Sequence, residues 1–318
     1  MKSKSFTVII LFFTDLIELF HLTKYIKKGN KTGTFYICNH HLGDTVIFCS
    51  IARSVKEIYK RKFTIIVNEE YESIPLLFGL DFISYDVPKF KGGLSEGLKQ
   101  IFLTFYNLFT NNKIIFSVQG FLQYFRYPRS LIWSDMYLRF MIAFNITSEI
   151  PLSCIEDLTS TSCRTLRIEF DSLGLIPRKS VVISPDSQSM ELIEPSFFLE
   201  IYHRLENIGY RALINSDKNY WVDKGVRTCF PDPLRLLNYF ALAGYSISSR
   251  SGVSDLFSFA TEGKNIVIYT SDIQKTHPDF IFNKRKQNLC GKIDEYFYDK
   301  SRLGDIIEQI ISSIMSTT

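Results

Sequence analysis

The sequence lacks the short motifs by which many nucleotide and metal sites are found. It contains no G-x-G-x-x-G fingerprint and no G-x-x-x-x-G-K-[ST] loop, so neither a standard dinucleotide site nor a P-loop is indicated. It also contains no H-E-x-x-H, no D-x-D pair and no G-x-S-x-G elbow. These absences argue against a zinc protease, a carboxylate clamp for a divalent metal on a sugar nucleotide, and an α/β-hydrolase.

Cysteine and net charge are both low. Six cysteines occur in 318 residues, none with C-x-x-C spacing, and a chain of this length does not need disulfides to hold a core. We therefore expect reduced thiols, a cytoplasmic protein, no metal site and no other cofactor. The net charge is only +4, from 37 bases and 33 acids, which argues against a nucleic-acid partner.

No apolar run is long enough to cross a bilayer, which needs about 20 residues. The longest run near the start, residues 6–13, follows Lys2 and Lys4 and is soon interrupted by Asp15 and Glu18. Apolar residues continue at helical spacing, and four lysines follow within residues 24–31. Two interpretations stay open: a leading helix packed on its domain, or an interfacial helix within residues 6–31 that makes peripheral contact with anionic lipid.

Short apolar segments alternate with amphipathic ones along most of the chain. We expect strands at 34–38, 62–67, 82–85, 114–118, 181–184, 210–215, 245–248 and 265–270. We expect helices at 44–59, 71–78, 94–109, 131–144, 196–208, 233–243, 253–260 and 303–315. This alternation predicts an α/β fold of two doubly wound, Rossmann-like domains facing a cleft. Residues 1–173, with a leading helix in 1–31, form the first domain, and residues 174–318 form the second.

Ligands of such sheets bind beyond the carboxyl ends of the strands, which draws attention to the loop after residues 34–38. It reads His40-His41-Leu42-Gly43-Asp44, where Gly43 allows a sharp turn. Asp44 is either the cap of the following helix or a general base. His40 and His41 are either ordinary loop histidines or groups that orient a substrate.

A second loop, residues 248–255, reads SSRSGVSD. Small residues with glycine at a helix start expose backbone N–H groups that suit a phosphate, and an arginine binds phosphate bidentately. We therefore predict a phosphate site at Ser249, Arg250, Ser251 and Gly252, with an ordinary strand-to-helix turn as the alternative. Weaker candidates on the same side are Ser184, Asp186, Ser187 and Asp255, since serine and aspartate are also common turn residues.

These segments resemble the heptosyltransferase-like glycosyltransferases of family 9, which have the GT-B fold. The resemblance lies in LGDTV after a strand, in FDSLGLIPRKSVVISPDSQ, and in the layout from PLRLLNYF to NIVIYT. This chain departs from the family pattern in three places. Arg250 stands where the family has aspartate, Asp255 stands where it has histidine, and the lysine or tryptophan usual after Ser184-Pro185 is missing. With these departures the sequence looks more like the divergent sugar transferases of surface-polysaccharide clusters.

The resemblance implies a hexosyl- or heptosyltransferase of lipopolysaccharide or capsule biosynthesis. Such an enzyme moves a sugar from a nucleotide-sugar donor to a hydroxyl of a glycan or lipid-linked acceptor, without metal and with inversion. It implies that Asp44 is the catalytic base, with His40, His41 and Gly43 on the acceptor side. The donor diphosphate lies at Ser251 and Gly252 with Arg250 nearby, and the helix dipole and Arg250 stabilise the departing nucleoside diphosphate. Two alternatives remain: a sugar-nucleotide epimerase of GT-B type, and a non-catalytic paralogue that binds glycan or a partner transferase.

Overall fold

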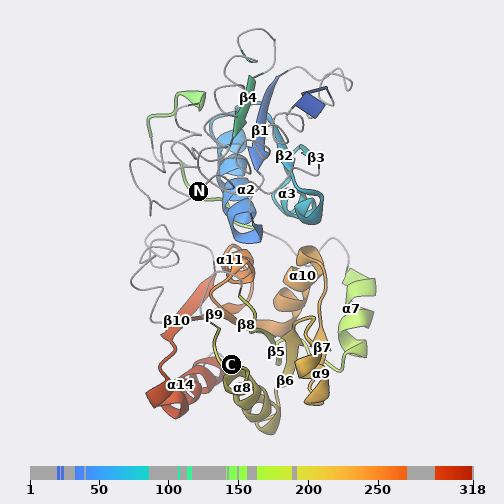
Figure 1. The fold of residues 1–318 in the computed structure, drawn as a ribbon, viewed down its shortest axis with the longest axis vertical. Helices are drawn as coiled ribbons and strands as arrows, with labels where there is room; N and C mark the ends of the chain where they lie inside the picture. The colour runs from blue at the N-terminus through green and yellow to red at the C-terminus, as the bar shows by residue number, and fades with distance from the viewer. Residues whose placement is uncertain are drawn as a thin grey trace, which may run out of the picture. The chain divides into compact units, whose positions relative to one another are not determined.

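The structure is a computed structural model that divides into two compact units, Met1–Ser153 and Cys154–Thr318 (Figure 1). It describes residues 20, 21, 23, 24, 33–38, 41–85, 107, 113–116, 141, 143–148, 150–155, 163–187, 192–270 and 291–316. The division falls before the predicted joint at residue 174. Helix α7 (Cys163–Ser172) precedes that joint and packs on α10 (Pro233–Ala243) within the second unit.

The first unit contains a four-stranded parallel sheet in the order β3-β2-β1-β4. Its strands are β1 (Thr34–Cys38), β2 (Thr64–Val67), β3 (Phe82–Ser84) and β4 (Lys113–Phe116). Helix α2 (Leu42–Glu57) follows β1, while η1 (Glu69–Tyr71) and α3 (Ser73–Leu77) follow β2. Strand β1 is buried on both faces from Phe35 to Cys38, as a central parallel strand must be.

The second unit contains a six-stranded parallel sheet in the order β10-β9-β8-β5-β6-β7. Its strands are β5 (Ser180–Ser184), β6 (Arg211–Asn215), β7 (Thr228–Cys229), β8 (Gly244–Ser249), β9 (Lys264–Tyr269) and β10 (Lys292–Phe297). The first three strands run outward from β5 in one direction and the last three in the other. The order therefore reverses between β5 and β8, which is the switch point of a doubly wound sheet.

Helices cover both faces of the second sheet (Figure 1). Helix α8 (Pro195–Asn207) and helix α14 (Leu303–Met315) pack together on one face, where every turn of α14 buries an isoleucine against the core. Helices α10 and α11 (Gly252–Ser258) pack against β5, β8 and β9. The predicted α/β class with two parallel sheets is confirmed.

Several predicted boundaries are wrong in detail. The helix expected from Ser196 begins one residue earlier at Pro195, whose fixed φ suits the first helical position. The helix expected over 71–78 is the short η1 followed by α3. Strands β7 and β10 and helices α7 and α9 (Asn219–Asp223) were not predicted. The expected helices at 94–109 and 131–144 lie mostly outside the described residues.

The cysteines give one correction. Cys154 is disulfide-bonded, whereas Cys38, Cys49 and Cys229 are free thiols. The expectation that all six cysteines are reduced is therefore wrong for Cys154. Within the part of the chain that the structure describes, no helix has the length and apolar character needed to cross a membrane. The leading segment 1–31 falls outside that part except at residues 20, 21, 23 and 24.

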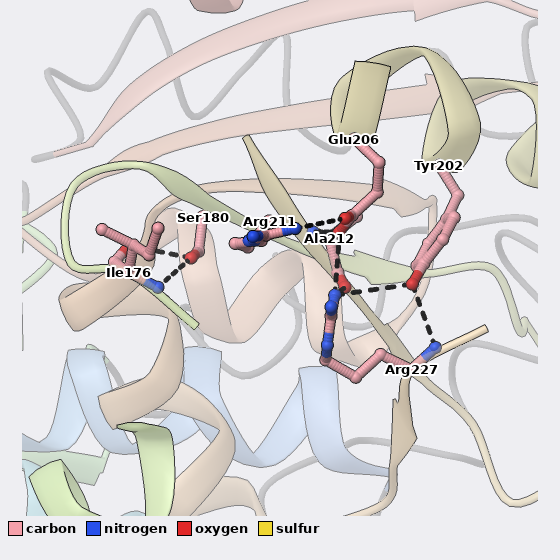
Figure 2. Close-up of polar contacts among 7 residues, drawn as sticks. All are labelled: Ile176, Ser180, Tyr202, Glu206, Arg211, Ala212 and Arg227. Carbon is pink, nitrogen blue, oxygen red and sulfur yellow. Dashed lines mark hydrogen bonds and ion pairs between the residues drawn. The ribbon is translucent and has the colours of Figure 1, made fainter. Parts of the chain in front are cut away.

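A polar network fixes the end of α8 to the starts of β6 and β7 (Figure 2). The carboxylate of Glu206 accepts hydrogen bonds from the backbone N–H of Ala212 at 2.8 Å, from Arg211 at 3.0 Å and from Arg227 at 2.8 Å. Arg227 also donates to the carbonyl of Ala212 at 2.9 Å, and its backbone N–H donates to the hydroxyl of Tyr202 at 3.1 Å. Glu206 thus joins the end of α8 to the starts of the next two strands, β6 and β7.

We expect Glu206→Gln to lower the free energy of unfolding by about 1–3 kcal/mol at neutral pH. Burial raises the pKa of Glu206, but the bonds from Ala212, Arg227 and Arg211 outweigh it, so the pKa is lowered. A lowered folded-state pKa stabilises the protein above the unfolded pKa of about 4.3 and loses that effect as pH falls below it. The difference between variant and wild type in chemical denaturation should therefore shrink below about pH 4.

Glu200→Gln is the matched control, because Glu200 lies on the same helix and makes only a half-exposed pair with Arg204. We expect it to change stability by less than about 0.5 kcal/mol. A Glu206→Gln variant as stable as the Glu200→Gln variant at pH 7 contradicts the role of the network.

Candidate functional site

Asp44 lies in the first turn of α2 and is not the cap of that helix. The N-cap is His41, which is exposed and whose side chain makes no capping hydrogen bond. Its carbonyl instead accepts from the backbone N–H of Thr45 at 3.0 Å and from the Thr45 hydroxyl at 3.1 Å. Gly43 is a buried helical residue, so the sharp turn expected there is not made. His40 lies outside the described residues.

Tyr71, on η1, takes the place of the missing cap. Its hydroxyl accepts the backbone N–H of Leu42, donates to the carboxylate of Glu70, and lies within the electrostatic reach of Asp44. Burial, followed by the hydrogen bond to Glu70, raises the pKa of Tyr71 well above its ordinary value. The phenol therefore stays protonated at neutral pH. Half-buried Asp44 is therefore one of the charges that the Tyr71 hydroxyl senses at the carboxyl edge of the first sheet.

Sequence analysis did not find Tyr71. The signal is one of topology: β1 and β2 are parallel neighbours with Cys38 opposite Val67, so the segments that follow them meet at one edge. A tyrosine shortly after β2 can then reach a helix that begins after β1.

The predicted donor-side residues of the second unit come together at its switch point. Ser184 ends β5 and lies opposite Ser248 of β8. The hydroxyl of Ser249 donates to the carbonyl of Pro185 at 2.6 Å, and the hydroxyl of Ser187 donates to the carbonyl of Arg250 at 2.9 Å. The loops after β5 and β8, predicted separately, are thus joined by two hydrogen bonds.

Arg250 forms a buried ion pair with Asp255 in the first turns of α11. Its Nη1 lies 2.9 Å from Oδ2 of Asp255, and the two side chains are only 8% and 3% exposed. The same nitrogen donates to the carbonyl of Ser251 at 2.8 Å and to the hydroxyl of Ser254 at 3.4 Å. The charge of the guanidinium is therefore met by a carboxylate of the same chain, and phosphate binding by Arg250 stays a prediction.

Buried polar contacts fix helix α11 beneath this loop. The hydroxyl of Ser254 accepts from the backbone N–H of Ser251 at 3.0 Å. The amide of Asn265 donates to the carbonyl of Ser254 at 3.1 Å and to the hydroxyl of Ser258 at 3.0 Å, while Ser246 donates to Asn265 at 2.9 Å. Sequence analysis missed these residues. Their signal is that Ser246 and Asn265 are polar within central parallel strands, where apolar residues prevail.

The loop after β6 adds a second acid–base pair. Asp186 accepts the hydroxyl of Ser216 at 2.5 Å and pairs with the ammonium of Lys218, which is about half exposed. The amide of Asn215 donates to the hydroxyl of Ser184 at 3.1 Å. Lys218 was not predicted as a site residue. It places a cation beside the loop after β5, which lacks the lysine or tryptophan that the resemblance leads one to expect after Ser184-Pro185.

Several buried polar atoms at this edge have no hydrogen-bond partner among the described residues. They include Oδ1 of Asn215, Oγ of Ser248, Oγ of Ser251 and Oγ1 of Thr270, at or just beyond the ends of β6, β8 and β9. Buried polar atoms are nearly always paired, so such a group marks an edge adapted to a ligand. No cluster of three or more His, Cys, Asp or Glu side chains able to hold a metal ion occurs within the described ranges.

No protein-family model matches the chain, and neither does any curated protein. Solved structures do. The glycosyl transferase family 9 protein from Veillonella parvula superposes with a TM-score of 0.60 at 14% identity, over 91% of this chain and 98% of that chain. Escherichia coli ADP-heptose lps heptosyltransferase II superposes with a TM-score of 0.61 at 11% identity, over 90% of this chain and 99% of that chain. E. coli heptosyltransferase WaaC with ADP gives 0.58 at 11% identity, over 89% and 99%.

These structures agree with the segments that first indicated the resemblance, and they extend it from short motifs to nearly the whole length of both chains. At such low identities the likeness concerns architecture. The resemblance is confirmed at that level: the chain has the GT-B fold of the family 9 heptosyltransferases.

Proposed function

We propose that this chain is a glycosyltransferase that moves a sugar from a nucleotide-sugar donor to a hydroxyl of a glycan or lipid-linked acceptor. The observation that carries the proposal is the meeting of three loops, after β5, β6 and β8, at the switch point of a family 9-like second unit. Doubly wound sheets bind their ligands at this place.

The donor is a nucleoside diphosphate sugar, bound at the carboxyl edge of the second sheet. WaaC, which has the same fold, has been solved with ADP. In this chain, Ser251 and Gly252 supply hydroxyl and backbone donors for the diphosphate, while Ser249 holds the loop through its hydrogen bond to Pro185. Lys218 is the nearby cation that is only half covered. Ser184, Asp186 and Ser187 hold the loop that faces them.

Asp44 is the general base. As the acceptor oxygen attacks the anomeric carbon, the carboxylate of Asp44 takes its proton, and the bond between that carbon and the diphosphate oxygen breaks. The electron pair leaves with the nucleoside diphosphate, and a single displacement inverts the configuration without a metal. Tyr71 fixes the start of α2, while His41, with His40 before it, lies on the acceptor side.

The acceptor belongs to a surface polysaccharide such as lipopolysaccharide or capsule. The enzyme works in the cytoplasm, with peripheral membrane contact through residues 6–31. The apolar and lysine-rich composition of that segment supports this part of the proposal.

A thermal-shift screen with ADP, UDP, GDP and CMP, each with and without EDTA, tests the proposal. One nucleoside diphosphate at about 100 times its Kd should stabilise the protein by about 2.7 kcal/mol, with EDTA making no difference. The matching nucleotide sugar should then transfer its sugar only when an acceptor is added. The absence of any shift favours a non-catalytic binding protein, and isomerisation of the donor sugar alone favours an epimerase.

A further inference from the structure

The two positions at which the donor loop departs from the family pattern contact each other. In the family pattern that the sequence resembles, aspartate stands at the position of Arg250 and histidine at that of Asp255. In the structure these two side chains form the buried 2.9 Å ion pair.

We propose that Arg250 and Asp255 act as one positioning unit that holds the donor loop in shape, and that neither residue binds the donor phosphate. This inference rests on the proposed glycosyltransferase function. A buried charge is tolerated only while its partner is present, since an unpaired ion in the interior costs several kcal/mol. To offer Nη1 to a diphosphate, the guanidinium would have to leave both Asp255 and the carbonyl of Ser251.

Residue 250 is anchored from three directions. Its backbone N–H donates to the carbonyl of Ile268 in β9 at 3.0 Å, its carbonyl accepts from Ser187 at 2.9 Å, and its side chain holds Asp255 of α11. A shift of the guanidinium is therefore transmitted to the loop after β5 and to the start of α11. The unit sets the position of Ser251 and Ser254, which are linked to each other at 3.0 Å.

The nucleotide affinity of the Asp255→Asn variant distinguishes a positioning role of Arg250 from direct phosphate binding by Arg250. If Arg250 binds phosphate directly, removing its competing carboxylate frees the guanidinium, and nucleotide affinity stays equal or rises. If the two residues are one unit, removing either charge disturbs the same loop, and both changes weaken binding.

The experiment compares Arg250→Gln, Asp255→Asn, the double variant, and the reversed pair Arg250→Asp with Asp255→Arg. Arg235→Gln is the control, because Arg235 is an exposed arginine of α10 in loose pairs with Asp232 and Glu169. Affinity is measured by calorimetry with whichever of ADP, UDP, GDP and CMP stabilises the wild type, and Tm is measured without ligand.

Each single variant should bind the nucleotide at least about 10-fold more weakly, with Tm lowered by about 6–20 °C, while the control leaves both unchanged. The double variant and the reversed pair should bind more tightly and melt higher than either single. The inference is overturned if Arg250→Gln weakens nucleotide binding while Asp255→Asn does not. It is also overturned if the loss of binding in the double variant equals the sum of the losses in the two single variants. If one of the single variants does not fold, a double variant that also does not fold contradicts the inference.

The experiment tests the proposed function separately from the coupling of Arg250 and Asp255. If no nucleotide binds the wild type, the glycosyltransferase assignment falls, and the Tm values alone still decide whether the two charges are coupled. Additive losses of Tm overturn the coupling, and a double variant that melts above both singles supports it.

Discussion

Asp44→Asn should lower the turnover of sugar transfer about 10²–10⁴-fold, equivalent to roughly 3–5 kcal/mol of activation free energy. The amide keeps the size of the side chain but cannot take the proton of the acceptor hydroxyl. Because Asp44 is a residue of the first helical turn and not its cap, the helix loses at most about 1 kcal/mol of favourable charge at its N-terminus. Initial rates at saturating donor and acceptor measure the effect.

Glu70→Gln is the matched control, since it removes a neighbouring carboxylate that hydrogen-bonds Tyr71. We expect its turnover to stay within a few-fold of wild type. The Asp44→Asn variant should also keep the Tm shift produced by the nucleotide. Turnover close to wild type in Asp44→Asn, or an equal loss in both variants, removes Asp44 from the role of base.

Gly263→Ala should lower the free energy of unfolding of the second unit by about 2–5 kcal/mol, the sum of backbone strain and overpacking. Gly263 has a φ of +85°, a left-handed conformation that side chains disfavour. A Cβ there would lie 2.7 Å from Cζ of Phe240. That ring cannot move aside easily, because it is 1% exposed and stacked on Phe257 with centroids 4.6 Å apart.

Gly209→Ala separates the two contributions. Gly209 has the same φ of +85° but nothing within 4 Å of its Cβ position, so only strain of about 1–2 kcal/mol is expected. Chemical denaturation can be followed by the fluorescence of Trp221, which is buried in the second unit, in a Trp133→Phe background. Equal losses in the two glycine variants would show that Phe240 relaxes and that overpacking contributes nothing.

Sequence patterns predicted the elements that are buried on one face or on all sides. Residues 34–38 form β1 and residues 303–315 form α14, as predicted, because a continuous apolar run and isoleucines at helical spacing each have one structural solution. Strand β10 was missed because it is an edge strand that reads KIDEYF, with two acids and a largely half-buried pattern. Strand β7 was missed because only two residues pair.

The candidate site was predictable in location but not in chemistry. The loops after residues 38, 184 and 249 could be chosen because parallel strands present their carboxyl ends together. The capping of Leu42 by Tyr71 and the pairing of Arg250 with Asp255 could not be chosen. They depend on which strands are neighbours and on the direction of each side chain, and neither is written in local spacing.

The central place of β5 has a consequence for synthesis on the ribosome. This strand is made first in its unit and pairs with β6, but its other partner, β8, begins only at Gly244. Until then Val181, Val182 and Ile183 present an unpaired apolar edge, a template for strands of other chains. Slow translation between residues 184 and 244 would therefore prolong the exposure of the nascent chain to aggregation and increase its need for chaperones.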